Sequence, residues 1–277
     1  MKSGIITESS ELYHAETEHI SSTPLRKMEL SPAHFFAAWK GKQEESTPAQ
    51  KRGTFFHDLL LEQNVSHYVP RPLKADGSLM PTSMNDYKAW LATIGDKTPI
   101  HPDDFNEMNA ALDAYCENKA AMKMIDGAEI EKSVYAVDHE TGIKVKARPD
   151  IWGKGRGYIV DLKSCGAIDK YFIKSIFSNG YDIQLEHYRD VIFQATGERI
   201  NDCYILAFET EAPYASKIFK LSRAALESAK QIRRQYLNEI KACMDDGIFP
   251  AYSQEITEVD RPEYLDDKLV TSFEGVG

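Results

Sequence analysis

Residues 146–164, KARPDIWGKGRGYIVDLKS, constrain the fold of this chain more than any other stretch of its sequence. Asp161 stands inside an otherwise apolar, strand-like run, where a buried carboxylate without a partner is costly. Because strand side chains alternate between the two faces of a sheet, Asp161 and Lys163 share one face. Val160 and Leu162 then share the opposite, apolar face. The sequence therefore predicts a strand with one apolar face and one face that carries an acid and a base.

A second aspartate, Asp150, ends the preceding strand-like segment, residues 143–151. If that segment pairs with residues 158–163 as a hairpin, the glycine-containing turn between them brings Asp150 close to Asp161. Two such carboxylates raise each other's pKa unless a cation lies between them, and Mg²⁺ binds one or two carboxylates together with water and phosphate oxygens. A lysine nearby can stabilise charge on a phosphate. From the spacing alone, a turn-capping aspartate beside a solvated edge-strand ion pair stays open as the alternative.

Further motifs, taken with this one, resemble the PD-(D/E)XK nuclease superfamily. Pro149-Asp150 followed by Asp161-Leu162-Lys163 is similar to the pattern that names the superfamily. Residues 53–57, GTFFH, resemble the Gly-x-x-x-His motif of RecB-like members, and residues 184–188, QLEHY, resemble a Gln-x-x-x-Tyr motif. Order and spacing cover about residues 50–195, and the flanking sequence is most similar to RecE-type (exonuclease VIII) nuclease domains. The resemblance implies an α/β (α+β) fold with a restriction-endonuclease-like core, a small mixed sheet flanked by helices.

The resemblance also implies roles for individual residues. Mg²⁺ is the implied cofactor, and Mn²⁺ can substitute for it. Gln184 and Tyr188, four positions apart and hence on one helical face, are implied to contact DNA phosphate or to order the site. Glu129 or Glu131 would supply an accessory acid. The implied metal ligands are His57, Asp150, Asp161 and the backbone carbonyl of Leu162, and Lys163 is the implied catalytic lysine.

Several of these residues also have structural interpretations. A lone histidine on an apolar helix, as His57 is, is more often a hydrogen-bonded core residue than a metal ligand. Gln184 and Tyr188 could equally be helix surface and packing. Glu129 and Glu131 would share one strand face, so the sequence does not choose between them, and each also reads as a solvated strand residue.

The charge distribution bears on the partner. The formal net charge of −10 argues by itself against nucleic-acid binding. However, residues 141–174 hold eight basic residues against three acidic ones, whereas residues 253–277 hold seven acidic against two basic. Lys170 and Lys174, interleaved with aromatic residues, are expected to track a DNA backbone or else to be solvated lysines of an amphipathic helix. Arg148 would share a strand face with Asp150 and contact the scissile phosphate.

The function implied by the resemblance is a Mg²⁺-dependent exonuclease that acts on double-stranded DNA ends. It would degrade linear duplex 5′→3′ and leave 3′ single-stranded tails for a RecT-like single-strand annealing protein. A toroidal homo-oligomer, a tetramer, is implied as the assembly. Two alternatives stay open: a restriction- or repair-type DNA endonuclease of the same superfamily, and a non-catalytic DNA-binding module in recombination.

The remaining expectations concern organisation. Residues 1–22 are expected to be a peripheral segment, residues 23–250 a single nuclease domain and residues 251–277 an acidic tail. No apolar run is long enough to cross a bilayer and no apolar signal-peptide region occurs at the N-terminus, so we expect a cytoplasmic protein without membrane contact. Four widely spaced cysteines favour reduced thiols, without an iron–sulfur cluster. Periodicity predicts helices at 25–30, 33–39, 53–62, 84–94, 104–124, 170–178, 183–195 and 223–244, and strands at 131–138, 143–151, 158–163, 203–208 and 216–221.

Overall fold

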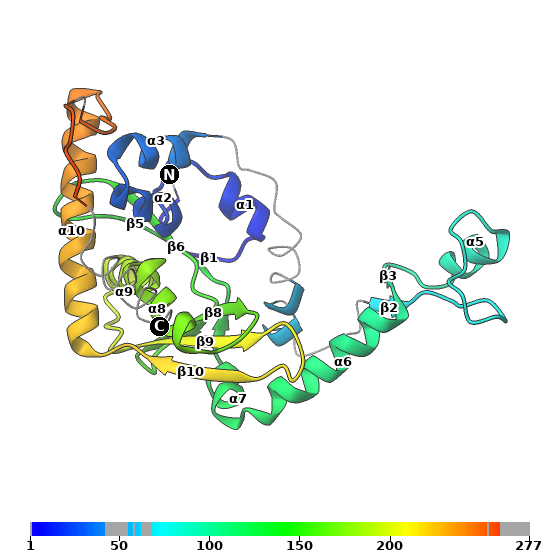
Figure 1. The fold of residues 1–277 in the computed structure, drawn as a ribbon. Helices are drawn as coiled ribbons and strands as arrows, with labels where there is room; N and C mark the ends of the chain where they lie inside the picture. Colours follow the sequence, from blue (N-terminus) through cyan, green and yellow to red (C-terminus); the bar gives the residue numbers. More distant parts are fainter. Residues whose placement is uncertain (1, 42–54, 58, 62–67, 254, 261–277) are drawn as a thin grey trace, which may run out of the picture.

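The structure is a computed structural model that describes residues 2–41, 55–57, 59–61, 68–253 and 255–260. Helices surround a small mixed sheet (Figure 1), and the predicted mixed α/β architecture is confirmed. The elements run in the order β1 (Gly4–Ile6), α1 (Ser10–Ala15), α2 (Ser22–Arg26), η1 (Lys27–Glu29), α3 (Pro32–Lys40), β2 (Tyr68–Pro70), α5 (Asn85–Leu91), β3 (Thr98–Ile100), α6 (Pro102–Glu117), α7 (Lys119–Ile125), β4 (Glu129–Ile130), β5 (Ser133–Val137), β6 (Lys144–Ala147), β7 (Ile151–Gly153), β8 (Tyr158–Cys165), α8 (Lys170–Ser178), α9 (Tyr181–Thr196), β9 (Asp202–Glu209), β10 (Ser216–Lys220) and α10 (Arg223–Asp246).

The main sheet has five strands in the order β10-β9-β8-β7-β4. Strands β8 and β9 pair in parallel, with Asp161 opposite Ile205, and the other neighbours are antiparallel. The turn between β7 and β8 uses Gly155 and Gly157, both at a φ of 74°, a conformation that glycine adopts at little cost. This turn places β7 directly beside β8, so the segments that carry Asp150 and Asp161 are neighbours, as predicted.

The faces of β8 differ in the way that the alternation predicts. Val160 and Leu162 join an apolar cluster with residues of α6, α7 and the helical segment around Phe56. Ile159, on the opposite face, joins a second cluster with residues of α8, α9 and α10. Asp161 belongs to this second face and is 1% exposed. The sheet is therefore covered on both sides, and its acid–base face points toward α9.

Two predicted elements divide and a third begins later than predicted, each at a residue that disfavours continuation. The predicted strand 143–151 becomes β6 and β7, because Pro149 lacks the N–H that a ladder needs. Of these two strands, only β7 pairs with β8. Strand β6 pairs with β5 at the edge of a separate three-stranded sheet, β1-β5-β6, so the predicted longer hairpin is wrong. The predicted strand 131–138 begins after Glu131, whose φ is 48°. Asn118 divides the predicted helix 104–124, since its side chain accepts a bond from the Ala121 N–H and caps α7.

The prediction that residues 1–22 form a peripheral segment is wrong for β1, Tyr13 and Ile20, which pack against the rest of the protein. Strand β1 pairs with β5, and the ring of Tyr13 is 4% exposed. Ile20 is fully buried and forms a parallel bridge with Val145. This packing holds α1 near the face of the sheet that carries the acids.

One segment projects from the body. Figure 1 shows β2, β3 and α5 at the far end of α6, away from the main sheet. The predicted helix at 53–62 falls partly outside the described residues, as does most of the predicted acidic tail. Within the part of the chain that the structure describes, no helix is both long and apolar enough to cross a membrane.

A buried carboxylate joins the small sheet to the last helix. Asp138 is fully buried and receives two hydrogen bonds from the Arg234 guanidinium, at 2.8 and 3.0 Å. Thr141 donates to it through both its hydroxyl and its backbone N–H. Burial alone would raise the pKa of Asp138, but these bonds hold the pKa well below its usual value. Because the folded-state pKa is depressed, the stabilisation is present above the unfolded pKa of about 4 and is lost as the pH falls below it.

We predict that Asp138→Ala lowers the free energy of unfolding at pH 7 by about 3 kcal/mol, because it removes a buried carboxylate that accepts two hydrogen bonds from Arg234 and two from Thr141. Urea denaturation followed by circular dichroism measures this. Glu140→Ala is the matched control, since Glu140 pairs with the same Arg234 at 3.2 Å but its side chain is 68% exposed. A change of less than about 0.5 kcal/mol is expected there; equal losses in the two variants would contradict the assignment.

Candidate active site

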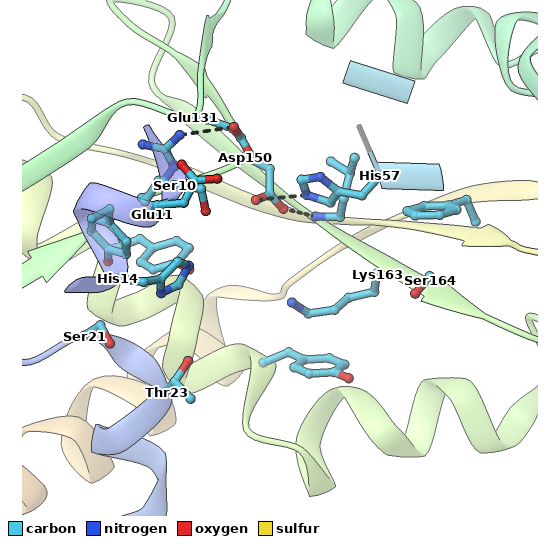
Figure 2. A pocket seen from close by; sticks show the side chains of 16 residues that line it. Ser10, Glu11, His14, Ser21, Thr23, His57, Glu131, Asp150, Lys163 and Ser164 are labelled. Carbon is cyan, nitrogen blue, oxygen red and sulfur yellow. Dashed lines mark hydrogen bonds and ion pairs between the residues drawn. The ribbon is translucent and has the colours of Figure 1, made fainter. Parts of the chain in front are cut away.

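A cleft of about 700 Å³ opens over the end of β8. His57, Glu131, Asp150 and Lys163 line it together with Ser10, Glu11 and His14 of α1 (Figure 2). Polar and ionisable groups therefore line a single space.

Three side chains in the cleft form a group suited to a metal ion. One ligand atom from each of His57, Glu131 and Asp150 lies within 4.8 Å of the other two. The Nε2 atom of His57 is 3.2 Å from Oδ1 of Asp150. Asp150 comes directly before β7, and His57 lies on the helical segment that packs against the apolar face of β8. The backbone of Glu131 reaches the group by donating its N–H to the Asp150 carbonyl, at 3.1 Å.

The donor set fits a divalent cation. Two carboxylates supply hard oxygen donors of the kind that Mg²⁺ and Mn²⁺ prefer, and the imidazole adds one nitrogen donor of borderline softness. Neighbouring ligands of an octahedral ion with bonds of 2.0–2.1 Å lie about 3 Å apart. The separation of His57 and Asp150 matches that spacing.

The carboxylate of Asp150 is also fixed from the strand. Its Oδ2 accepts a hydrogen bond of 2.6 Å from the backbone N–H of Leu162. Burial would raise the pKa of Asp150, but His57, Lys163 and this backbone bond hold it below its usual value. The carboxylate is therefore kept ionised, with Oδ1 aimed at His57. The Leu162 carbonyl as a metal ligand stays a prediction.

Asp161 lies beside this group and outside the three-residue cluster. Its Oδ2 is 2.5 Å from the Lys163 ammonium, and its Oδ1 accepts from Nε2 of Gln184 at 2.8 Å. Burial raises the pKa of Asp161, Lys163 opposes that rise and Asp150 adds to it. The structure thus brings Asp150 and Asp161 close together, as predicted, but gives Asp161 protein partners.

Gln184 and Tyr188 belong to the same buried network. Nε2 of Gln184 also lies 2.7 Å from the Tyr188 hydroxyl, and both side chains are 7% exposed. Burial raises the pKa of Tyr188, so the phenol stays neutral and can accept this bond. Of the two roles implied for Gln184, the geometry favours ordering Asp161. Tyr188 also reaches the wall of the cleft.

Lys163 is held between two groups. Its ammonium pairs with Asp161 and lies 4.6 Å from the ring centroid of Tyr181, at the start of α9. Its side chain is 18% exposed and reaches the cleft. An ammonium held in this way is a hydrogen-bond donor directed at the cleft.

The remaining predicted residues are distributed differently. Glu129 lies on β4 and pairs with Lys132 at 3.7 Å, so of the two candidate accessory acids Glu131 reaches the cluster. Arg148 is not on a strand face with Asp150, because Pro149 separates the two strands; its guanidinium pairs with Glu131 at 3.1 Å. Lys170 and Lys174 are exposed on α8.

Sequence reasoning missed the wall formed by α1. Ser10, Glu11 and His14 come from the segment predicted to be peripheral, and no motif marks them. Tyr181 was also missed, although an aromatic residue three positions before the Gln-x-x-x-Tyr motif was a usable signal.

Comparisons with known proteins concern the family and the fold. The model of a PDDEXK-like domain of unknown function (DUF3799) matches residues 21–262. A solved structure from Eubacterium rectale, of a protein with a proposed exonuclease activity, has a TM-score of 0.60 at 16% identity. That comparison covers 95% of this chain and 98% of that chain. An alkaline exonuclease from Laribacter hongkongensis, LHK-Exo, has a TM-score of 0.33 at 11% identity, over 95% of this chain and 100% of that chain, too low to carry an argument. A search of curated proteins gives no match.

We predict that Glu131→Gln weakens Mn²⁺ binding at least tenfold, because it removes one of the two carboxylates of the cluster. Even the loss of a residue that only orients a metal ligand typically lowers metal affinity by about 10–100-fold. Isothermal titration calorimetry measures the affinity. Glu129→Gln is the matched control, two positions away, and is expected to bind Mn²⁺ like the wild type. A loss confined to Glu129→Gln would show that the wrong acid has been chosen.

Proposed function

The chain belongs to the family of PDDEXK-like domains DUF3799, and from this premise we propose that it is a Mg²⁺-dependent exonuclease acting on linear double-stranded DNA. The predicted membership of the PD-(D/E)XK superfamily and the restriction-endonuclease-like fold are confirmed, and the chain is a nuclease. The similarity to RecE-type domains stays a prediction.

The observation that carries the proposal is the placement of His57, Glu131 and Asp150 beside Lys163 in one cleft. The first three would hold the cation, and Mn²⁺ would substitute for Mg²⁺. A divalent cation in such a site supplies Lewis-acid stabilisation of phosphate charge and a water of lowered pKa. Lys163 donates a hydrogen bond into the same space, where it would meet a phosphate oxygen or the attacking water.

The surrounding residues keep Lys163 directed at the cleft. Gln184 fixes the Asp161 carboxylate, and Asp161 in turn fixes the Lys163 ammonium. Because Asp161 is 1% exposed, this chain of contacts lies under the cleft and leaves room for substrate above it. Asp161 as a direct metal ligand, together with the Leu162 carbonyl, remains part of the proposal.

The surface beside the cleft supports action on DNA. The cleft itself, at about 700 Å³, has the size of a site that binds a small molecule or a short part of a larger one. Helix α8 follows directly after β8 and exposes Lys170 and Lys174 together with Tyr171, which is 67% exposed. We expect the lysines to contact the DNA backbone and the ring to stack on a base.

The finer parts of the proposal rest on the sequence resemblance. They are digestion in the 5′→3′ direction, 3′ tails passed to a RecT-like annealing protein in prophage recombination, a toroidal tetramer and a cytoplasmic setting. The alternative is an endonuclease of the same superfamily.

We predict that linear duplex DNA is digested only when Mg²⁺ or Mn²⁺ is present and that covalently closed circular duplex is left intact. Linear substrates labelled at the 5′ or the 3′ end give the direction: early release of the 5′ label as mononucleotide is expected. Cutting of closed circles would support the endonuclease alternative, and early release of the 3′ label would reverse the proposed polarity.

We also predict that Lys163→Met lowers the rate of hydrolysis by about 10²–10³-fold, the loss typical when one donor to a developing charge is removed. Mn²⁺ binding should persist in this variant, whereas Asp150→Asn should lose both binding and activity. The matched control is Lys220→Met, since Lys220 of β10 pairs with Asp202 of β9 and does not line the cleft. Full activity of Lys163→Met would contradict the proposed role.

A further inference from the structure

Arg148 connects three separate segments. Its Nη2 donates to Glu131 at 3.1 Å, while its Nη1 donates to the Ser133 hydroxyl at 3.0 Å and to the Glu8 carbonyl at 3.1 Å. The side chain is 11% exposed. Both terminal nitrogens therefore already donate to acceptors within the protein.

Glu131 needs an external support. It lies at the joint between β4 of the main sheet and β5 of the small sheet, in a left-handed conformation with a φ of 48°. A backbone in this region is held by its surroundings. The side chain is 34% exposed, and fixing a glutamate side chain in one rotamer costs conformational entropy. The bond to Arg148 is the contact that selects the rotamer in which the carboxylate faces Asp150 and His57.

The same region of the chain holds the opposite wall of the cleft. We call residues 8–16 the N-terminal strap. Lys146, two positions before Arg148, donates to the carbonyls of Tyr13 and Glu16, and Arg148 donates to the carbonyl of Glu8. The two basic side chains therefore pin both ends of the strap. Between those ends, Ser10, Glu11 and His14 line the same cleft as the cluster (Figure 2).

We propose that Arg148 is a positioning residue that holds the Glu131 carboxylate in the metal-binding cluster and fixes the N-terminal strap opposite it. This proposal rests on the proposed metal-dependent nuclease function. One guanidinium then fixes the positions of both the Glu131 carboxylate and the N-terminal strap. A lysine in its place keeps the charge but cannot reach three acceptors in the fixed fork geometry of arginine.

The test is a double-mutant cycle on Mn²⁺ affinity, measured by calorimetry on the wild type, Arg148→Lys, Glu131→Gln and the double variant. If Arg148 acts through Glu131, Arg148→Lys weakens binding about tenfold or more and changes the electron paramagnetic resonance spectrum of the bound ion. The double variant then binds no more weakly than Glu131→Gln alone. Hydrogen–deuterium exchange of residues 8–16 should accelerate in Arg148→Lys.

Arg189→Lys is the matched control. Arg189 pairs with Glu186 at 2.9 Å, and neither residue lines the cleft. This variant should leave the Mn²⁺ affinity and the hydrogen–deuterium exchange of the N-terminal strap unchanged. Arg148→Gln serves as a second variant, and thermal denaturation verifies that each variant is folded. If the wild type binds no divalent cation, the proposed function itself fails. If the wild type binds and Arg148→Lys binds equally, or if the two substitutions are additive, the positioning role is overturned.

Discussion

The buried carboxylate of Asp161 is the constraint on which the arrangement of the site depends. A charge in the middle of a sheet persists only with partners, and Asp161 has two: the Lys163 ammonium and the Gln184 amide. The first comes from the same strand, two positions on, and the second requires α9 to cross that face of the sheet. Satisfying one carboxylate therefore fixes where a lysine and a helix lie. Asp150, which lines the cleft, lies beside them because its carboxylate accepts a hydrogen bond from the N–H of Leu162, the residue after Asp161 on β8.

Local sequence information was sufficient to predict how Asp150, Asp161 and Lys163 lie relative to one another. The alternation in β8 placed Asp161 and Lys163 on one face, and the glycine-containing turn placed Asp150 beside them, because both depend on residues close in the chain. The spacing of Gln184 and Tyr188 likewise predicts one helical face, and their mutual hydrogen bond confirms it. The local sequence does not show which residue this helix face contacts. The hydrogen bond from Gln184 to Asp161 forms only because α9 packs on the sheet.

The other half of the site could not be predicted from local pattern. Glu131 is set apart from Glu129 by a left-handed backbone conformation that no alternation rule anticipates, since a non-glycine residue rarely adopts it. Strand β6 was expected beside β8, but it pairs with β5, and Pro149 separates it from β7. The N-terminal strap is polar and carries no motif. Its place over the cleft follows from contacts such as Lys146 with the Tyr13 carbonyl, more than a hundred positions apart in the chain.

Because of these long-range contacts, the two walls of the cleft are held with different firmness. The face with Asp150 and Asp161 is built on a central strand and its antiparallel neighbour, where backbone pairing resists displacement. The opposite wall is a six-residue helix with one buried residue, Tyr13, tied down at both ends by basic side chains. Elements with little buried apolar surface open at low free-energy cost. Substrate-dependent adjustment of the cleft is therefore expected in α1 rather than in the sheet, and Arg148, which touches both the strap and Glu131, is where such an adjustment would reach the metal-binding cluster.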